Sequence, residues 1–194
     1  MKPRQSELFD EFHGPDGLLY RPRFLSTDEE SGLLDAIREL RLEEAQYKQW
    51  KARRRIVSYG ARYDFDRNEL EPSGPVPAFL EPLRRRISAE TGLSEEALAY
   101  ALVAEYRPGV QLGWHRDVPS FADVVGISLL GPARMRFRPY PPTGQRRGVF
   151  ALELEPRSLY VLTGDARWRG QHAISPTKSL RYSITFRTLA PVAP

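Results

Sequence analysis

Two of the three histidines in this chain lie in a pattern that can bind a metal ion. His115 and Asp117 form an H-R-D triplet, and His172 follows 55 residues after Asp117. Because side chains alternate along an extended segment, the first and third residues of the triplet point to the same side. Two histidines and one carboxylate can occupy one face of a metal and leave the opposite positions open, as in non-haem Fe(II) oxygenases. The three side chains are therefore candidate ligands of Fe(II).

The alternative for the triplet is a surface histidine beside an aspartate in a turn. The preceding Gly113 and Trp114 weigh against an ordinary exposed loop. Zinc hydrolases also use two histidines and a carboxylate, but no H-E-x-x-H pattern supplies the general base that they need. Iron is favoured over zinc, while Mn(II) or Ni(II) could occupy the site without chemistry. His13 lies in a segment rich in glycine and proline and is expected to be solvated.

An arginine-bearing segment, R-Y-S-I-T-F-R, follows the last histidine. Arg181 and Arg187 share one face of it and lie about 20 Å apart if it is fully extended. The planar guanidinium group pairs with a carboxylate through two parallel hydrogen bonds. The two arginines could thus bracket a five-carbon diacid such as 2-oxoglutarate. For either arginine alone, a surface ion pair is the alternative.

Two helices are predicted in the N-terminal half. The first begins near Ser26 or Thr27, because Ser26 and Glu29 have the spacing of a capping box. The second runs from about Pro77 to Glu90. Each helix has one apolar face. The residues on these faces are Leu33, Ile37 and Leu40 in the first helix, and Phe79, Leu80, Leu83 and Ile87 in the second. Residues 1–26 are predicted to be irregular or extended, and residues 56–65 partly extended.

The C-terminal half changes to short β-type runs separated by glycine and proline. The predicted strands cover about 98–106, 110–115, 123–130, 133–138, 148–154, 157–163, 170–174 and 180–188. Eight short strands predict a β-sandwich or barrel rather than a parallel α/β sheet. In the last strand, Tyr182, Ile184 and Phe186 face one side. Arg181, Ser183, Thr185 and Arg187 face the other.

Size and composition fit one globular domain of 194 residues. No apolar run approaches the ~20 residues that span a membrane. The chain has no cysteine, so disulfides and thiolate metal sites are excluded and a cytoplasmic location is expected. A net charge of +4 makes polyanions plausible partners. The expected oligomeric state is a monomer.

Four ordered segments resemble the AlkB-like family of Fe(II)/2-oxoglutarate-dependent dioxygenases. They are A-E-Y-R-P-G-V-Q-L-G-W-H-R-D, G-I-S-L-L, P-R-S-L-Y-V-L-T-G-D-A-R-W-R-G-Q-H-A-I and R-Y-S-I-T-F-R. The resemblance covers about residues 53–188. Within it, R-R-I-V-S-Y-G-A-R-Y-D-F is similar to the substrate-side element of family members, notably of the tRNA-modifying branch.

The resemblance implies a mainly β fold with N-terminal helices (α+β), built on a double-stranded β-helix or jelly-roll core with a substrate lid. Residues 1–194 would form one dioxygenase domain. In it, residues 1–97 would be an N-terminal extension with the helices and the lid, and residues 98–190 the catalytic core.

The resemblance also implies residue roles. His115, Asp117 and His172 would bind Fe(II). Arg181, assisted by Tyr106, would pair with the distal carboxylate of 2-oxoglutarate, and Arg187 would lie near its metal-chelating end. The reaction would consume O₂, convert 2-oxoglutarate to succinate and CO₂, and hydroxylate an N-methyl group that then leaves as formaldehyde.

Three positions depart from the pattern of family members that repair alkylated bases. Ala104 stands where those members have an asparagine that helps to bind the co-substrate. Ser183 stands where an asparagine is common, and its hydroxyl can still donate one hydrogen bond. Pro119 stands where an acidic residue contacts the damaged base, and proline offers no side-chain donor or acceptor. These departures affect the prediction of the substrate more than the predictions of the iron and the co-substrate.

An alkylated base would have to leave its stack to reach the iron. The aromatic candidates for stacking are Trp50, Tyr59, Tyr63, Phe65, Trp114 and Trp168. The basic candidates for phosphate contacts are Arg53, Arg54, Arg55, Arg62, Arg134, Arg136 and Arg138. For each aromatic residue, a place in the core is the interpretation that we favour over base stacking. For the arginines the alternative is a solvated face, which is the interpretation that we favour for Arg84–Arg86.

The leading hypothesis is a dioxygenase that oxidatively demethylates alkylated DNA or RNA. A second hypothesis keeps the same chemistry on a protein side chain, a lipid or a small molecule, and Pro119 is the main reason to retain it. A third is a non-catalytic nucleic-acid-binding jelly roll. The complete ligand set and both arginines argue against the third.

Overall fold

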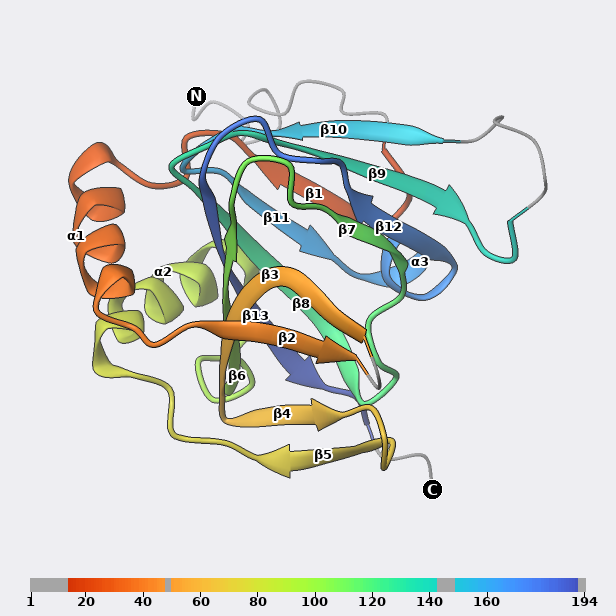
Figure 1. Cartoon of the computed structure of the whole chain (residues 1–194), viewed down its shortest axis with the longest axis horizontal. Coiled ribbons are helices and arrows are strands. Elements are labelled where there is room, and N and C mark those ends of the chain that lie inside the picture. The colour runs from red at the N-terminus through yellow and green to blue at the C-terminus, as the bar shows by residue number, and fades with distance from the viewer. Residues whose placement is uncertain (1–13, 48–49, 143–148, 192–194) are drawn as a thin grey trace, which may run out of the picture.

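The computed structural model describes residues 14–47, 50–142 and 149–191, and for residues 46, 47, 50 and 51 it describes the backbone only. His13 and the side chain of Trp50 therefore lie outside the described residues. Two antiparallel sheets face each other in this part of the chain (Figure 1). The predicted mainly β fold with a jelly-roll core is confirmed by this arrangement and by the solved structures described below.

The larger sheet has seven strands. In spatial order they are β1 (Leu18–Arg21), β11 (Leu159–Leu162), β8 (Phe121–Leu129), β13 (Arg181–Leu189), β6 (Tyr100–Tyr106), β3 (Trp50–Tyr59) and β2 (Glu43–Tyr47). The smaller sheet consists of β10 (Phe150–Leu154), β9 (Ala133–Pro139), β12 (Gly170–Ile174) and β7 (Leu112–His115). A separate hairpin is formed by β4 (Ala61–Asp64) and β5 (Glu69–Pro72). All eight strands predicted after residue 98 are present, with ends shifted by a few residues.

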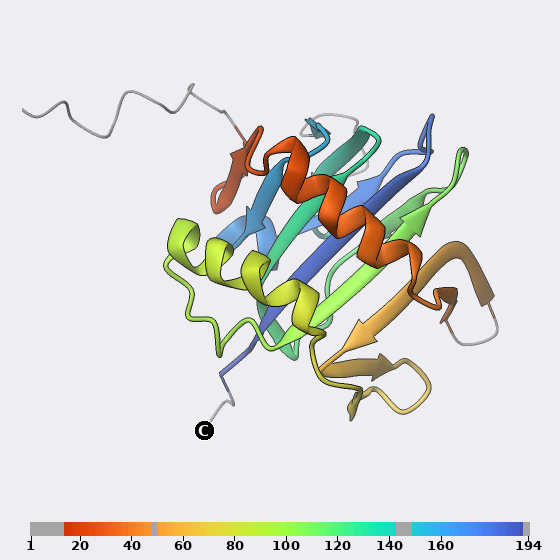
Figure 2. The ribbon, with the colours of Figure 1, turned by 90° about the vertical axis from the view of Figure 1, so that its left-hand side faces the viewer.

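The helices lie on the side of the larger sheet that faces away from the smaller one (Figure 2). They are α1 (Thr27–Arg38), the short 3-10 helix η1 (Ala78–Leu80) and α2 (Glu81–Thr91); α3 (Gly164–Trp168) precedes β12. Leu33, Ile37, Leu80, Leu83 and Ile87 are buried against the sheet, as their spacing predicted. A second core, with Met135, Phe137 and Leu162 among its members, fills the space between the two sheets.

The N-terminal region contributes more to the sheets than the sequence predicted. The predicted boundary between extension and core lay at residue 97, yet β1, β2 and β3 all belong to the larger sheet. Strand β3 pairs with β6 from Arg55↔Glu105 to Tyr59↔Ala101. The sequence predicted residues 1–26 as irregular or extended and residues 56–65 as partly extended. It did not assign them to the sheet, because β1 is only four residues long and β3 is rich in arginine, so neither shows a clear apolar alternation. The region before residue 98 thus forms part of the larger sheet.

The predicted capping box at the start of α1 is present. The Ser26 hydroxyl accepts a hydrogen bond from the Glu29 amide at 3.2 Å, and the Glu29 carboxylate accepts one from the Ser26 amide at 2.8 Å. We expect Ser26→Ala to lower the free energy of unfolding by about 1 kcal/mol, because the Glu29 amide loses its side-chain acceptor at the helix start. Chemical denaturation measures this change. The matched control is Ser31→Ala on the exposed side of the same helix, which should cause no loss, and equal losses in both variants would contradict the capping argument.

Candidate metal centre and active site

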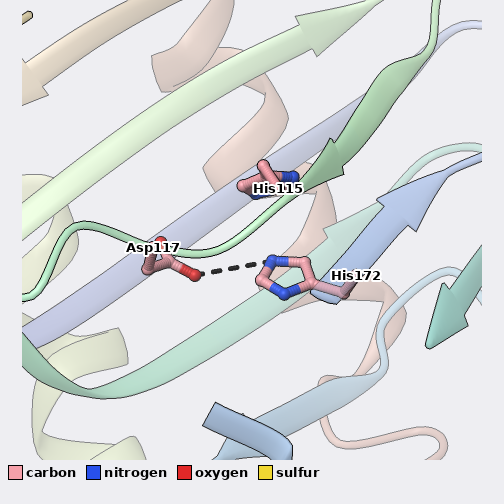
Figure 3. A group of neighbouring side chains, drawn as sticks. All are labelled: His115, Asp117 and His172. Atoms are coloured by element: carbon pink, nitrogen blue, oxygen red, sulfur yellow. Dashed lines mark ion pairs between the residues drawn. The ribbon is translucent and has the colours of Figure 1, made fainter. Parts of the chain in front are cut away.

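The three candidate metal ligands converge where β7 and β12 lie side by side (Figure 3). His115 and His172 are directly opposite each other in the β7–β12 ladder, and their ring centroids are 4.2 Å apart. Asp117 follows β7, and its Oδ2 atom lies 3.4 Å from Nε2 of His172. One ligand atom from each residue lies within 4.8 Å of the others. The strand pairing therefore explains how residues 55 positions apart in the sequence form one cluster.

The surroundings orient these side chains toward a shared point. Nδ1 of His115 lies 2.9 Å from the Gly113 carbonyl oxygen, so the ring can donate there and present Nε2 to a metal. Arg187 donates from Nε to Oδ1 of Asp117 at 3.1 Å. The other carboxylate oxygen, Oδ2, is buried without a hydrogen-bond partner. A buried carboxylate oxygen left open beside two imidazoles is what a divalent cation would satisfy, so these residues fit an iron ion.

The protonation states also suit metal binding. Burial lowers the pKa of His115, and it lowers the pKa of His172 to about 3. Burial by itself raises the pKa of Asp117, but the charge of Arg187 and the two histidines outweigh it and hold that pKa below its ordinary value. At neutral pH the site therefore offers two neutral imidazoles and one carboxylate, the forms that coordinate a metal.

The cluster opens into a cavity of ≈ 310 Å³ between the two sheets. Strand β13 supplies one wall. Its side chains alternate as predicted: Tyr182, Ile184 and Phe186 pack toward the helices. Those facing the cavity are Arg181, Ser183, Thr185 and Arg187. Tyr106 of β6, opposite Arg181 in the ladder, also lines it. All the residues that the sequence linked to 2-oxoglutarate thus border the same cavity as the metal cluster.

Arg181 is the most deeply buried cation of this cavity, with 1% of its surface exposed. Its Nε donates to the Ser128 hydroxyl at 3.0 Å, and its guanidinium lies 4.9 Å from the ring centroid of Tyr106. Its Nη1 is buried without a partner. Among the described residues no carboxylate lies within ion-pairing distance of it. A buried cation in this state favours an anionic ligand, and a carboxylate matches its geometry.

Arg54 is a cavity residue whose position the sequence did not predict. It stands in the R-R-R run, where the sequence indicated contacts with phosphate. In the structure its side chain is 7% exposed, and its Nη1 donates to the Tyr106 hydroxyl at 3.2 Å. Burial raises the pKa of Tyr106, but the charges of Arg54 and Arg181 outweigh it and lower the pKa overall. Only the pairing of β3 with β6 brings Arg54 here.

Tyr160 is a second cavity residue that sequence reasoning missed. It lies on β11 opposite Gly126 of β8, and a Cβ at Gly126 would stand 2.1 Å from the tyrosine ring. The glycine therefore makes room for the ring, which lines the cavity. The signal in the sequence was the glycine inside an otherwise β-branched run, V-V-G-I, since glycine within a strand often marks a close approach.

The candidate substrate residues separate into two groups. Trp114 and Phe65 border the cavity, and the ring of Tyr63 packs edge-on to that of Phe65 with centroids 5.0 Å apart. Tyr59 instead packs into the core between the larger sheet and the helices. Of the two interpretations for Tyr59, stacking on a substrate or a place in the core, the structure shows the core, because alternation along β3 turns the residue to the face opposite Arg54.

The two flanking arginines of the R-R-R run do not border the cavity either. Arg53 is exposed. Arg55 is held by Glu105, with Nε and Oε1 3.0 Å apart. At the position that is acidic in repair members, Pro119 is exposed next to the metal cluster. Arg62 is paired with Glu71 across the β4–β5 hairpin at 2.7 Å.

Comparisons with known proteins agree with this site. Residues 17–187 match the 2OG-Fe(II) oxygenase superfamily. The chain is 30% identical over 180 residues to "Alkylated DNA repair protein ALKBH8 homolog" of Arabidopsis thaliana, covering 81% of this chain and 50% of the relative. It is 33% identical over 162 residues to "Alpha-ketoglutarate-dependent dioxygenase alkB homolog 7, mitochondrial" of Bos taurus, covering 82% of this chain and 67% of the relative.

A solved structure, "The structure of OsALKBH1", superimposes with a TM-score of 0.69 at 18% identity, covering 89% of this chain and 96% of that chain. At that identity the likeness shows the fold alone. The chain spans about half the length of its Arabidopsis relative. Together the match over residues 17–187, the AlkB-type relatives and the buried histidine–aspartate cluster show that this chain belongs to the 2OG-Fe(II) oxygenase superfamily, in its AlkB-like branch.

Proposed function

We propose that this protein is a dioxygenase that oxidatively demethylates alkylated bases in nucleic acid, using Fe(II), 2-oxoglutarate and O₂. The observation that carries the proposal is a single cavity that holds both the open metal cluster and the uncompensated guanidinium of Arg181. A metal and an anionic co-substrate can therefore be bound side by side. Fe(II) supplies the activation of O₂, which amino-acid side chains do not provide.

In this proposal His115, Asp117 and His172 hold the iron. Arg181 binds the distal carboxylate of 2-oxoglutarate, and Ser128 fixes the guanidinium through its hydrogen bond. The Tyr106 hydroxyl lies beside that carboxylate, and Ser183 offers a hydroxyl from the same wall. Arg187 fixes the metal-binding carboxylate of Asp117.

The proposed substrate is an N-methylated base. One O₂ and one 2-oxoglutarate yield succinate, CO₂ and an N-hydroxymethyl group, and that group leaves as formaldehyde with restoration of the N–H. Phe65 lines the cavity, and stacking between rings is how extruded bases are held. The printed name of the Arabidopsis relative refers to repair of alkylated DNA, which supports the same substrate class.

Mass spectrometry on a panel of N-methylated DNA and RNA oligonucleotides tests this function. With Fe(II), 2-oxoglutarate and ascorbate, the native protein should remove one methyl mass from at least one oligonucleotide, and His115→Ala should remove none. Succinate formation is measured in parallel. Turnover of 2-oxoglutarate without any change in the oligonucleotides would overturn the nucleic-acid substrate and favour a protein, lipid or small molecule. Absence of turnover would favour a non-catalytic binding module.

We further propose that residues 1–194 form one catalytic domain that acts as a monomer. No helix among the described residues is long and apolar enough to cross a membrane. We propose a cytoplasmic location because the chain contains no cysteine. The bovine relative is mitochondrial by its printed name, so fractionation of cells that express the tagged chain is the direct test.

A further inference from the structure

The outer face of the smaller sheet carries an aromatic ring between two arginines. Met135 and Phe137 of β9 point into the core between the sheets, so the alternate residues Arg136 and Arg138 point outward. On β7, Trp114 precedes the inward-pointing His115. The guanidinium carbons of Arg136 and Arg138 lie 4.9 Å and 4.4 Å from the Trp114 ring centroid. We call this group, Trp114 with Arg136 and Arg138, the outer platform.

Within the part of the chain that the structure describes, no ion pair neutralises the charges of the outer platform. The neighbouring Arg134 lies 3.6 Å from Glu153. In contrast, neither Arg136 nor Arg138 has a carboxylate within ion-pairing distance among the described residues. The Nε atom of Arg138 donates to the Gln171 side chain at 2.8 Å, which fixes its plane without removing its charge. Both side chains are half-buried rather than freely extended into solvent. The platform therefore presents two fixed positive charges flanking an aromatic ring.

The outer platform is connected to the cavity. Trp114 and Arg116 flank His115 in the segment that lines the cavity. The guanidinium of Arg116 lies 4.9 Å from the ring centroid of Tyr140, which is 47% exposed just beyond β9. Arg116 also donates from Nη2 to the Trp168 carbonyl oxygen at 3.0 Å, and the ring of Trp168 is itself exposed. Arginines and aromatic rings thus follow one another from the cavity mouth onto the outer sheet face.

We propose that the outer platform binds single-stranded nucleic acid, and that it holds the nucleotides next to the base that enters the cavity. This inference rests on the proposed function. Surfaces that bind single strands combine aromatic rings, on which bases stack, with cations that contact phosphates. Arginine suits both tasks, since its planar group stacks on rings and pairs with phosphate through two hydrogen bonds. A single strand also spares the cost of unpairing the target base.

Fluorescence anisotropy with labelled, unmethylated 12-nucleotide DNA and RNA strands tests the outer platform. The test variant is the double substitution Arg136→Gln with Arg138→Gln, and the binding constant is measured at several salt concentrations. We expect affinity to fall about tenfold and the slope of log K against log salt to shrink by about 1 to 2, because two phosphate contacts are lost. Binding of 2-oxoglutarate and Mn(II) should stay at the native level.

A matched control removes the same charge elsewhere. Arg38→Gln with Arg85→Gln lies on α1 and α2, on the other side of the larger sheet. An equal loss of oligonucleotide affinity in this control would overturn the inference, because net charge alone would then explain the weaker binding. Arg138→Lys keeps the charge but lacks the planar group. Its affinity for the oligonucleotides should therefore lie between that of the native protein and that of the double glutamine variant. Circular dichroism establishes that each variant is folded.

The remaining outcomes separate this inference from the proposed function. If the native protein demethylates oligonucleotides and the platform variant binds them as tightly as the native protein does, the inference about the outer platform is wrong. The proposed function is then unaffected. If the native protein neither binds nor demethylates any strand while it still turns over 2-oxoglutarate, both proposals are wrong. A platform variant that demethylates a methylated nucleoside normally but a 12-nucleotide strand poorly would support both.

Discussion

Replacing Asp117 with asparagine is expected to abolish metal binding and, with it, turnover of 2-oxoglutarate. The substitution keeps the shape of the side chain but removes the negative charge between the two histidines and Arg187. A divalent cation would then meet two neutral imidazoles and a neutral amide, with the uncompensated charge of Arg187 close by. The loss should exceed the roughly 100-fold effect typical of removing a residue that only orients a metal ligand.

Thermal unfolding with Mn(II) measures the metal directly, apart from any activity. At a free concentration of 100 times its dissociation constant, a metal stabilises the native protein by about 2.7 kcal/mol, which raises its melting temperature. Asp117→Asn should show no metal-dependent shift. The control Asp165→Asn removes an exposed carboxylate of α3 and should keep the full shift. A native-sized shift in Asp117→Asn would contradict the assignment of this carboxylate as a ligand.

The alternation of side chains along strands was the most successful basis for predicting the site from the sequence. On β13 it placed Arg181, Ser183 and Arg187 on one face, and the structure puts all three in the cavity wall. The H-x-D spacing likewise placed His115 and Asp117 on one side. The sequence could indicate that His172 lies near His115 and Asp117, but it could not indicate which strands bring it there. Its position opposite His115 depends on hydrogen bonds between β7 and β12, which no local pattern in either strand encodes.

The run of Arg53, Arg54 and Arg55 shows what the sequence alone could not predict, namely the environment of each arginine. Three identical residues take three different roles: Arg53 is exposed, Arg54 enters the cavity and Arg55 pairs with Glu105. Composition predicts one shared role for such a run, a basic surface. The roles separate only because β3 pairs with β6, which turns alternate residues to opposite faces and brings Glu105 opposite Arg55. Pairing between distant strands decides the environment of each arginine, so residue type alone could not predict it.

The same reasoning applies to Tyr59, whose aromatic type made it a candidate for the substrate as well as for the core. It packs between the sheet and the helices, on the face opposite Arg54. Had β3 been recognised as a strand and Arg54 fixed on its cavity face, the odd separation of five positions would have placed Tyr59 on the other side. Aromatic side chains serve cores as readily as binding sites, since both use their large apolar surface.

Arg181→Met is expected to weaken 2-oxoglutarate binding about 100-fold without lowering the stability of the protein free of ligands. A charge-assisted pair with two hydrogen bonds contributes about 3 kcal/mol, which corresponds to that change in dissociation constant. The Arg181 guanidinium is buried beside Ser128 and Tyr106, and its Nη1 has no partner. Burying such a charge is costly, and methionine fills similar space without it. The free energy of unfolding should therefore stay level or rise.

Arg167→Met is the matched control, because it removes an equally buried arginine with a different role. Arg167 is 2% exposed, against 1% for Arg181, and donates to the carbonyl oxygens of Val118, Phe121 and Ala122. Its loss leaves three carbonyls without these donors and should lower the free energy of unfolding by about 2 to 4 kcal/mol. Calorimetric titration of 2-oxoglutarate into the folded Mn(II)-loaded variants, with denaturation of the ligand-free forms, should show opposite patterns. If Arg181→Met is destabilised and still binds 2-oxoglutarate normally, Arg181 supports the fold and the co-substrate carboxylate must be bound elsewhere.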